Sequence, residues 1–219
     1  MKNNFFLFLF FTFLVSSSQT INLNESYLTD YLRISPLLGE FKSEMSFTLR
    51  PLDFGKNGLG INKEIFDTEK YAPTVLSFLK GNGKIKILPI DYNIEFNSHH
   101  PYNRNNGSMV PNRGYQHIFS AGIYAEIGPL SIQLKPEYLY SENKDFEGFG
   151  EGPNGHYPVI WVKRYKLWNK IDMPERFGEK SINKSLIGQS SIRLNFKGLS
   201  LGLSNENIWW GPSIRNSIM

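Results

Sequence analysis

Apolar and polar residues alternate along several stretches of the chain, and a period of two predicts β-strands. The pattern predicts strands over 44–50, 84–97 and 117–127. Within 84–97 the alternation slips by one residue at Leu88-Pro89, which predicts a bulge. After the N-terminal apolar run, no stretch shows a convincing helical period and no internal repeat is visible. The predicted fold class is therefore all-β.

Tight turns connect further alternating stretches. The run 130–140 follows a Gly-Pro turn, and the runs 190–196 and 199–204 flank a Lys-Gly turn. These arrangements predict antiparallel hairpins. The run 130–140 predicts a single strand of about the length that a tilted membrane strand needs, and Pro136 within it is a mild objection, because proline donates no ladder hydrogen bond.

Alternation alone does not reveal which face of a strand is buried. In a soluble sandwich the apolar face points inward, whereas in a membrane barrel it points to lipid and the polar face lines the lumen. Long connections at about 98–116 and 141–189 alternate with the tight turns, as outer loops and periplasmic turns do in outer-membrane barrels. The sequence therefore favours an antiparallel transmembrane β-barrel over a soluble exported β-domain. The predicted lipid-facing residues are Leu130, Ile132, Leu134, Ile192, Leu194, Leu199, Leu201 and Leu203. The predicted lumen-facing residues are Lys135, Glu137, Arg193 and Asn195.

The N-terminus has the pattern of a secretory signal peptide. Lys2 precedes an apolar run over 5–15, and small polar residues follow it. The run is shorter than the roughly 20 residues of a spanning helix. We therefore predict a signal peptide over 1–19, an N-terminal periplasmic segment with the first strand or strands over 20–83, and barrel strands with long extracellular loops over 84–219. The predicted location is the cell outer membrane.

Three features of the composition bear on this prediction. The chain has no cysteine, so an exported domain must be held by packing and hydrogen bonds without disulfides. The net charge of +4 comes without any basic run, which argues against nucleic acid as a partner. Aromatic residues make up 15% of the chain, a feature that outer-membrane barrels share with carbohydrate-binding surfaces.

Motifs for catalysis and metal binding are weak. A glycine pattern at 150–155 matches a phosphate-binding spacing, but it follows no predicted strand, opens no helix and contains Pro153. His99 and His100 are adjacent and would point to opposite faces of a strand, which argues against zinc. The acidic residues in 142–151 fit no calcium loop, and no nucleophile elbow is present. The sequence predicts no enzyme, no catalytic residue, no metal and no cofactor.

Aromatic and polar side chains provide the candidates for ligand binding. Aromatic rings pack on the C–H faces of sugars, and Arg and Asn side chains hydrogen-bond hydroxyls and carboxylates. The candidate ligand-binding residues are Trp209, Trp210, Arg215, Asn216, Arg113 and Tyr115. The competing interpretation is that the aromatic side chains only anchor the protein at the membrane interface.

Three stretches together resemble the Wzi-type capsule assembly family: "RGYQHIFSAGIYAEIGPLSIQLKPEYLYSENKDFEGF" (113–149), "IDMPERFG" (171–178) and "GQSSIRLNFKGLSLGLSNENIWWGPSIRNSIM" (188–219). The resemblance covers about 85–219 and is poor in the N-terminal region, and Ser213 stands where a second glycine is expected. It implies an outer-membrane β-barrel that binds capsular or another surface polysaccharide and helps to attach or assemble capsule, without catalysis. The alternatives are a passive porin and an outer-membrane hydrolase.

The resemblance also implies that the barrel is partial. A barrel of this family has about 18 strands, whereas roughly eight can be counted here. The chain is therefore predicted to be the N-terminal portion of a longer protein, with a complete eight-stranded barrel as the alternative.

The orientation of the two adjacent tryptophans depends on where the last strand ends. Unbroken alternation from Leu199 would point Trp209 to lipid and Trp210 inward. Asn205 would then face lipid, so we expect a bulge or a strand end there, which would reverse the assignment.

Overall fold

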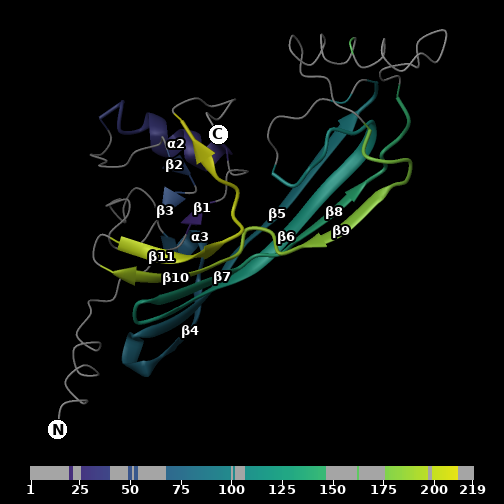
Figure 1. Cartoon of the computed structure of the whole chain (residues 1–219). Helices are drawn as coiled ribbons and strands as arrows, with labels where there is room; N and C mark the ends of the chain where they lie inside the picture. The colour runs from purple at the N-terminus through teal and green to yellow at the C-terminus, as the bar shows by residue number, and fades with distance from the viewer. Residues whose placement is uncertain are drawn as a thin grey trace. The chain divides into compact units, whose positions relative to one another are not determined.

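The computed structural model describes residues 20–21, 26–39, 49–50, 52–53, 68–99, 101, 107–146, 162, 176–196 and 199–211. Its main strands are β4 (Thr74–Phe78), β5 (Gly83–Asn97), β6 (Gly114–Ile127), β7 (Leu130–Leu134), β8 (Glu137–Ser141), β9 (Ile182–Leu186), β10 (Ser191–Phe196) and β11 (Leu199–Ser204). They form an eight-stranded sheet in the order β11-β10-β7-β6-β5-β4, in which β8 pairs with β6 and β9 (Figure 1). The described fold is thus mainly β-sheet, as predicted.

Smaller elements accompany the sheet. Two short antiparallel ladders join β1 (Thr20–Ile21) to β3 (Leu52–Asp53) and β2 (Leu49–Arg50) to β12 (Trp209–Trp210). A short 3-10 turn, η2 (Leu79–Gly81), follows β4. Only the last two residues of the strand predicted over 44–50 are described, and the predicted signal peptide lies outside the described residues.

Two helices correct the prediction that none would follow the signal peptide: α2 (Ser26–Ile34) and α3 (Thr68–Tyr71). In α2 the buried residues Thr29 and Leu32 are three positions apart, which is the spacing of a helix face. Arg33 in the last turn complements the helix dipole. Leu32 is the fully buried apolar side chain among those described in this short helix, which explains its weak periodic signal in sequence.

Among the residues that the structure describes, no helix has the length and apolar character required to cross a membrane.

The chain divides into two compact units, each described separately below. Unit 1 comprises Met1–Asp91, Ser120–Glu137 and Leu186–Met219. Unit 2 comprises Tyr92–Phe119 and Tyr138–Ser185. The buried apolar residues of unit 1 include Ala72, Leu88 and Tyr124, which form one cluster. Those of unit 2 are Met109, Ile118 and Leu139, with Ile182 packed against them.

The predicted hairpins are present. β6 and β7 pair antiparallel up to Ile127 opposite Leu130, so Gly128-Pro129 makes a two-residue turn. Gly128 has a φ of +57°, a backbone conformation that glycine adopts without steric cost. β10 and β11 pair antiparallel along their whole length, from Ser191 opposite Ser204 onwards.

The single strand predicted over 130–140 is wrong, because the chain divides at Lys135-Pro136 into β7 and β8. β7 pairs with β10, whereas β8 pairs with β9. Pro136 has no N–H to donate to a ladder, which explains the break. The carbonyl of Lys135 instead accepts from the Gln189 N–H at 2.9 Å, and the carbonyl of Pro136 accepts from Ser120 Oγ at 3.0 Å.

Two strands of the eight-stranded sheet were not predicted as such. β9 lies inside the long connection predicted over 141–189, and only Ile182 and Leu186 in it are apolar, so its alternation is weak. β4 pairs with β5 through a register shift between Thr74 and Leu76, which breaks the period of two.

In β7, in β10 and over 90–97 of β5, the sheet is inverted relative to a soluble sheet: the apolar side chains are more exposed than the polar ones between them. Leu88, Ile118 and Leu139 are buried apolar exceptions, and β11 is exposed on both faces. In β7, Ile132 and Leu134 are exposed while Ser131 and Gln133 are buried. We call these two sides the exposed face and the buried face of the sheet. The predicted slip in β5 is visible as a change of phase, since the exposed positions move from Ile87 to Ile90.

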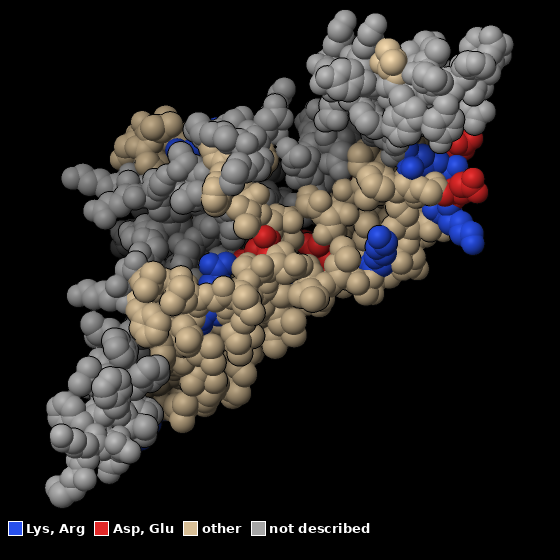
Figure 2. Space-filling view, in the orientation of Figure 1, with Lys and Arg blue, Asp and Glu red and all other residues tan. Residues whose placement is uncertain are grey.

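The residues that the sequence assigned to two opposite faces do separate in this way. All the predicted lipid-facing residues are exposed except Leu130, which is half-buried. Of the predicted lumen-facing residues, Lys135, Glu137 and Asn195 are buried and Arg193 is half-buried. The described surface in Figure 2 is mostly uncharged, with charged side chains gathered in a few places.

Candidate functional site

The buried face of unit 1 carries a buried ion pair. Lys135, at the end of β7, has only 2% of its side chain exposed, and its Nζ lies 2.6 Å from Asp91 Oδ2 on β5. A buried ammonium group is tolerated only with such a partner, because leaving water costs it several kcal/mol of hydration. This pair therefore fixes β5 and β7 relative to each other.

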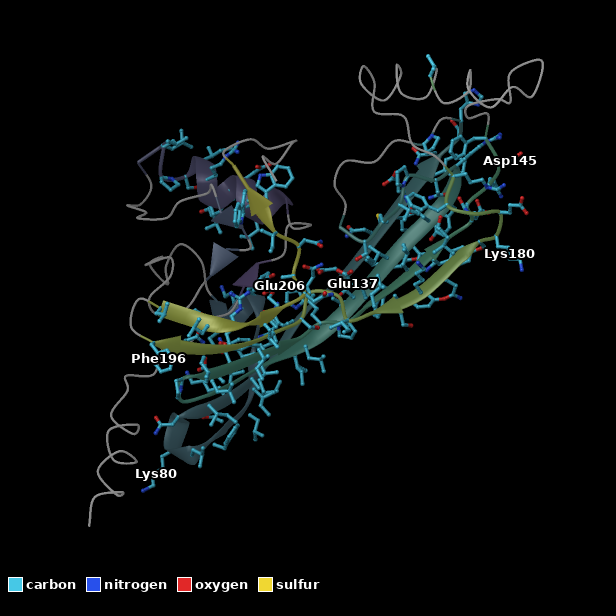
Figure 3. All side chains as sticks on the ribbon, in the orientation of Figure 1. Lys80, Glu137, Asp145, Lys180, Phe196 and Glu206 are labelled. Carbon is cyan, nitrogen blue, oxygen red and sulfur yellow. The ribbon has the colours of Figure 1, made fainter. Side chains whose placement is uncertain are left out.

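A network of hydrogen bonds on the same buried face surrounds Glu206. Gln133 Nε2 donates to the carbonyl of Gln189 at 3.0 Å and to Glu206 Oε1 at 3.2 Å. Arg193 Nη2 is bonded to Glu206 Oε2. Gln189 Nε2 in turn donates to Glu137 Oε1 at 2.8 Å, so the two glutamates labelled in Figure 3 are linked through Gln133 and Gln189. Gln133, Gln189, Glu137 and Glu206 are buried, Arg193 is half-buried, and the hydrogen bonds among them join the strands of this face.

Another ion pair joins α3 to the same face. Lys86 Nζ lies 3.0 Å from Glu69 Oε1, and the Thr74 hydroxyl donates to the same oxygen at 3.1 Å. Burial alone would raise the pKa of Glu69, but the hydrogen bonds from Lys86 and Thr74 outweigh it and lower the pKa to about 2. Glu69 is therefore a carboxylate at neutral pH.

The buried face of unit 2 differs, because whole polar side chains there have no partner among the described residues, whereas in the described part of unit 1 single atoms, Arg193 Nε and Asn207 Nδ2, have none. The side chains of Asn112 and Gln116 are both 0% exposed. Neither the nitrogen nor the oxygen of either amide has a hydrogen-bond partner in the described part of the chain. The same holds for Ser141 Oγ, whose residue is also fully buried.

These side chains come from adjacent segments. Arg113 bridges Lys144 in antiparallel register, and the Glu142 N–H donates to the Tyr115 carbonyl at 2.9 Å. Continuing this register places Gln116 of β6 opposite Ser141 of β8 on the same face of the sheet.

The next pair on that face is Ile118 and Leu139, against which Met109 packs. An apolar wall therefore lies next to the unpartnered amide and hydroxyl of Gln116 and Ser141.

Asn143 shows that the same face also contains a structural amide. Its Nδ2 donates to the carbonyls of Phe177, Gly178 and Lys180 at 2.9 to 3.2 Å. This amide holds the chain segment that carries Lys180, which is labelled in Figure 3. Its Oδ1 has no partner among the described residues.

The exposed face of unit 2 carries an aromatic cluster centred on His117. The ring of His117 lies 5.4 to 6.2 Å, between centroids, from four tyrosines: Tyr92, Tyr115, Tyr138 and Tyr140. The hydroxyls of Tyr92 and Tyr115 are 3.2 Å apart. Tyr115, a candidate ligand-binding residue, thus belongs to a group of amphipathic rings suited either to sugar C–H faces or to a membrane interface.

Charged residues lie beside this cluster where β6 begins and β8 ends. Hydrogen bonds from Lys144 and from the Tyr115 backbone N–H lower the pKa of Glu142, which remains a carboxylate. Arg113, another candidate ligand-binding residue, donates from Nε to the Ser98 carbonyl at 3.1 Å and from Nη1 to the Asp145 carbonyl at 2.8 Å. These two donors of Arg113 are engaged with the protein itself.

The two tryptophans are separated from the main sheet. β11 ends at Ser204, as expected from the polar residue that follows, and β12 pairs with β2. Trp209 is 6% exposed and Trp210 44% exposed. Because β12 lies outside the main sheet, which tryptophan faces lipid and which faces the lumen stays a prediction. The candidates Arg215 and Asn216 lie outside the described residues.

Sequence reasoning missed Asn112, Gln116 and Ser141. The parity of β6 places Gln116 on the face opposite Phe119 and Ile123, so the alternation contained a signal for its position. It contained no signal for the missing partners, since these depend on contacts between strands.

No group of three or more His, Cys, Asp or Glu side chains in the described part of the chain is placed to hold a metal ion. Comparisons with protein-family models, with curated proteins and with solved structures found no match to this chain. The assignment of function therefore depends on the geometry of the two faces.

Proposed function

We propose that this chain is part of an outer-membrane β-barrel that binds exopolysaccharide and helps to attach or assemble capsule at the cell surface. The observation that carries the proposal is the inverted sheet. A sheet in water buries its large apolar side chains, whereas Leu201, at 60% exposed, and its neighbours on β10 and β11 are open to the surroundings. A lipid bilayer supplies the apolar surroundings that such a face requires.

The aromatic cluster around His117 also supports contact between the exposed face and lipid. Tyrosines are enriched where a membrane meets water, because the ring is apolar and the hydroxyl is polar. Charged residues such as Arg113 and Glu142 follow this cluster, as expected of strand ends that leave the bilayer. In this arrangement the apolar runs of the strands contact lipid, and the charged strand ends contact water.

The buried face favours a binding protein over a passive porin. A porin lumen is lined by water-exposed polar side chains. In the described part of unit 1, Lys135, Gln133 and Glu206 are instead buried and hydrogen-bonded within the protein. This packing leaves little room for a solute pathway there.

Polysaccharide is the ligand class that the available side chains fit. Ring faces in the His117 cluster and at Trp210 suit the C–H faces of sugars, and neutral amides suit their hydroxyls. The resemblance of residues 113–149 and 188–219 to capsule assembly proteins leads to the same ligand class. None of these interactions requires catalysis.

Deletion of the protein in the cells that produce it tests the proposal. We expect capsule to be lost from the cell surface into the medium, while uptake of small solutes stays unchanged. Restoring the full-length protein should restore retention. Normal capsule retention together with altered permeability would contradict the proposal and support a porin.

A further inference from the structure

We infer that unit 2 binds the phosphate headgroup of an anionic membrane lipid, with Arg113 as the anchoring cation and the tyrosines around His117 beside the headgroup. The inference rests on the proposed function, because it names a lipid that contacts the exposed face once the sheet lies in a bilayer. It starts from an arginine whose charge has no acidic partner in the described part of the chain.

Two ion pairs lie where β6 begins and β8 ends. Lys144 Nζ is 2.8 Å from Glu142 Oε2, and Arg176 Nη1 is 3.4 Å from Asp145 Oδ1. Arg113 lies next to both pairs, since its backbone bridges Lys144 and its side chain donates to the Asp145 carbonyl. A carbonyl oxygen accepts a hydrogen bond but carries no full charge, so the positive charge of Arg113 is not compensated by an acid.

The guanidinium group of Arg113 is held in place with part of it unused. Nε donates to the Ser98 carbonyl at 3.1 Å and Nη1 to the Asp145 carbonyl at 2.8 Å, which ties the group to the chain after β5 and after β8. No described residue accepts a hydrogen bond from Nη2, and the residue is only half-buried. A fixed, planar guanidinium with free N–H groups suits the oxygens of a phosphate.

The cations of unit 1 show that such an arginine is unusual in this sheet. Lys84, Lys86, Lys135 and Arg193 each pair with a carboxylate. Arg113 is likewise partly withdrawn from water, yet no described acid pairs with it. Because a cation loses hydration on burial, an anion bound at Arg113 would compensate for that loss.

The aromatic cluster next to Arg113 indicates that this anion belongs to a lipid. Tyr92 is 53% and Tyr138 38% exposed, so the cluster is open to its surroundings. Tyrosine rings suit the depth at which headgroups meet acyl chains. Phe119, two positions beyond His117 on the same side of β6, is exposed and apolar. Charge, amphipathic rings and apolar surface thus follow one another in the order of a headgroup, an interface and an acyl chain.

The test uses the full chain in phosphatidylcholine vesicles. Phe119→Cys carries a fluorescent label beside the cluster, and Leu201→Cys carries the same label on the exposed face of unit 1. A small fraction of either phosphatidylglycerol, which is anionic, or phosphatidylcholine bears a nitroxide on its acyl chain and quenches a label that it contacts. At position 119 we expect half-quenching at about fivefold less nitroxide-labelled phosphatidylglycerol than phosphatidylcholine. At position 201 the two lipids should quench equally.

Substitutions then assign the preference to Arg113. Arg113→Gln removes the charge and should abolish the preference at position 119, with quenching by phosphatidylcholine unchanged. The matched control is Lys180→Gln, which removes an equal charge from an exposed position of unit 2 and should retain the preference. Arg113→Lys keeps the charge without the planar fork and should retain part of the preference, so it remains informative if Arg113→Gln folds poorly.

The outcomes distinguish the inference from the proposed function. Equal quenching by the two lipids at position 119 of the parent would overturn the inference, while efficient quenching at both positions leaves the membrane location standing. Absence of quenching at both positions would contradict the proposed function itself. A preference that survives Arg113→Gln, or that Lys180→Gln lowers as much, would show that overall charge attracts the lipid without a site at Arg113.

One further addition tests whether the anion is a lipid. Acidic oligosaccharides released from the surface polysaccharide of the producing cells are added to the vesicles. We expect the preference for phosphatidylglycerol at position 119 to persist. Its loss would overturn the lipid as the occupant and assign Arg113 to a soluble acidic saccharide.

Discussion

The buried faces of the two units use polar side chains in opposite ways. In unit 1, Lys135, Gln133 and Asn195 all bond to neighbouring side chains or carbonyls. In unit 2, Gln116 and Asn112 are at least as deeply buried and have no side-chain partner among the described residues. The sheet therefore contains a region whose buried polar side chains are hydrogen-bonded to one another and a region in which buried polar side chains have no such partner.

This difference separates two meanings of a buried polar residue. A satisfied network stabilises one arrangement of strands, and removing one member leaves the others unpaired. An unsatisfied cluster reduces stability. Substitution should therefore have opposite effects on the free energy of unfolding in the two units.

The largest expected effect comes from breaking the ion pair of unit 1. Lys135→Met leaves Asp91 without its cationic partner on a mostly buried face, which should lower the free energy of unfolding by about 3 kcal/mol. The matched control is Lys144→Met, whose ion pair with Glu142 is exposed to solvent, so its loss should lower the free energy of unfolding far less. Urea unfolding in vesicles measures both. Equal losses would show that the two units do not differ in this way.

The next largest loss of stability is expected on the exposed face of unit 1. Leu201→Arg places a charge on the exposed face of β11 and should cost about 2–4 kcal/mol near the middle of a bilayer. Ser200→Arg places the same charge on the opposite, polar side and should cost less. The folded fraction in vesicles measures the cost, and equal tolerance at the two positions would contradict a lipid-facing sheet.

Substitution of one asparagine in each unit compares the two buried faces directly. Asn195 donates from Nδ2 to Ser131 Oγ at 2.8 Å and accepts from Ser200 Oγ at 2.7 Å. Asn195→Leu should therefore lower the free energy of unfolding by about 1–3 kcal/mol. Asn112→Leu should leave it unchanged or raise it, since neither amide atom of Asn112 has a partner. Thermal unfolding of the two variants tests this, and destabilisation of both would place Asn112 in a structural network.

The smallest effect is a dependence on pH that belongs to unit 1. The pKa of Glu69 falls from 4.5 to about 2 in the folded protein, so its ion pair with Lys86 stabilises the fold fully above pH 4.5. That stabilisation is lost as the pH falls from 4.5 towards 2. Because Glu69 is partly exposed, solvent screening keeps the effect below about 1 kcal/mol. Between pH 5 and pH 2 the melting temperature of Glu69→Gln should therefore fall less than that of the parent; parallel curves would contradict the assignment.

Much of the sheet was predictable because its signal is local. The alternation over 117–127, 190–196 and 199–204 determined both the strands and the two opposite faces. Local pattern failed where another interaction decided the outcome. Pro136 ended a strand within an unbroken alternation, and β9 carried too few apolar residues to be recognised before its pairing with β8 was known.

The candidate site was less predictable, for a physical reason. Composition identified aromatic residues, and Tyr115 does lie in a cluster with His117 of the same strand, but the other tyrosines of that cluster come from β5 and β8. For Gln116, sequence gives the strand and the face but not the absence of a partner. Whether the Gln116 amide has a partner depends on which side chains of the neighbouring strands lie next to it.

The most direct test of the inverted sheet is a map of what surrounds its exposed face. The chain has no cysteine, so single cysteines can carry a nitroxide label without background. We propose labels at Ile132, Leu194 and Leu201 on the exposed face, and at Lys144 and Lys180 in the charged region of unit 2. In vesicles, the first three should collide more often with oxygen, which dissolves in lipid, than with a water-soluble nickel complex, and the two lysine positions should show the reverse. Water-like accessibility at Ile132, Leu194 and Leu201 would contradict a membrane-embedded sheet.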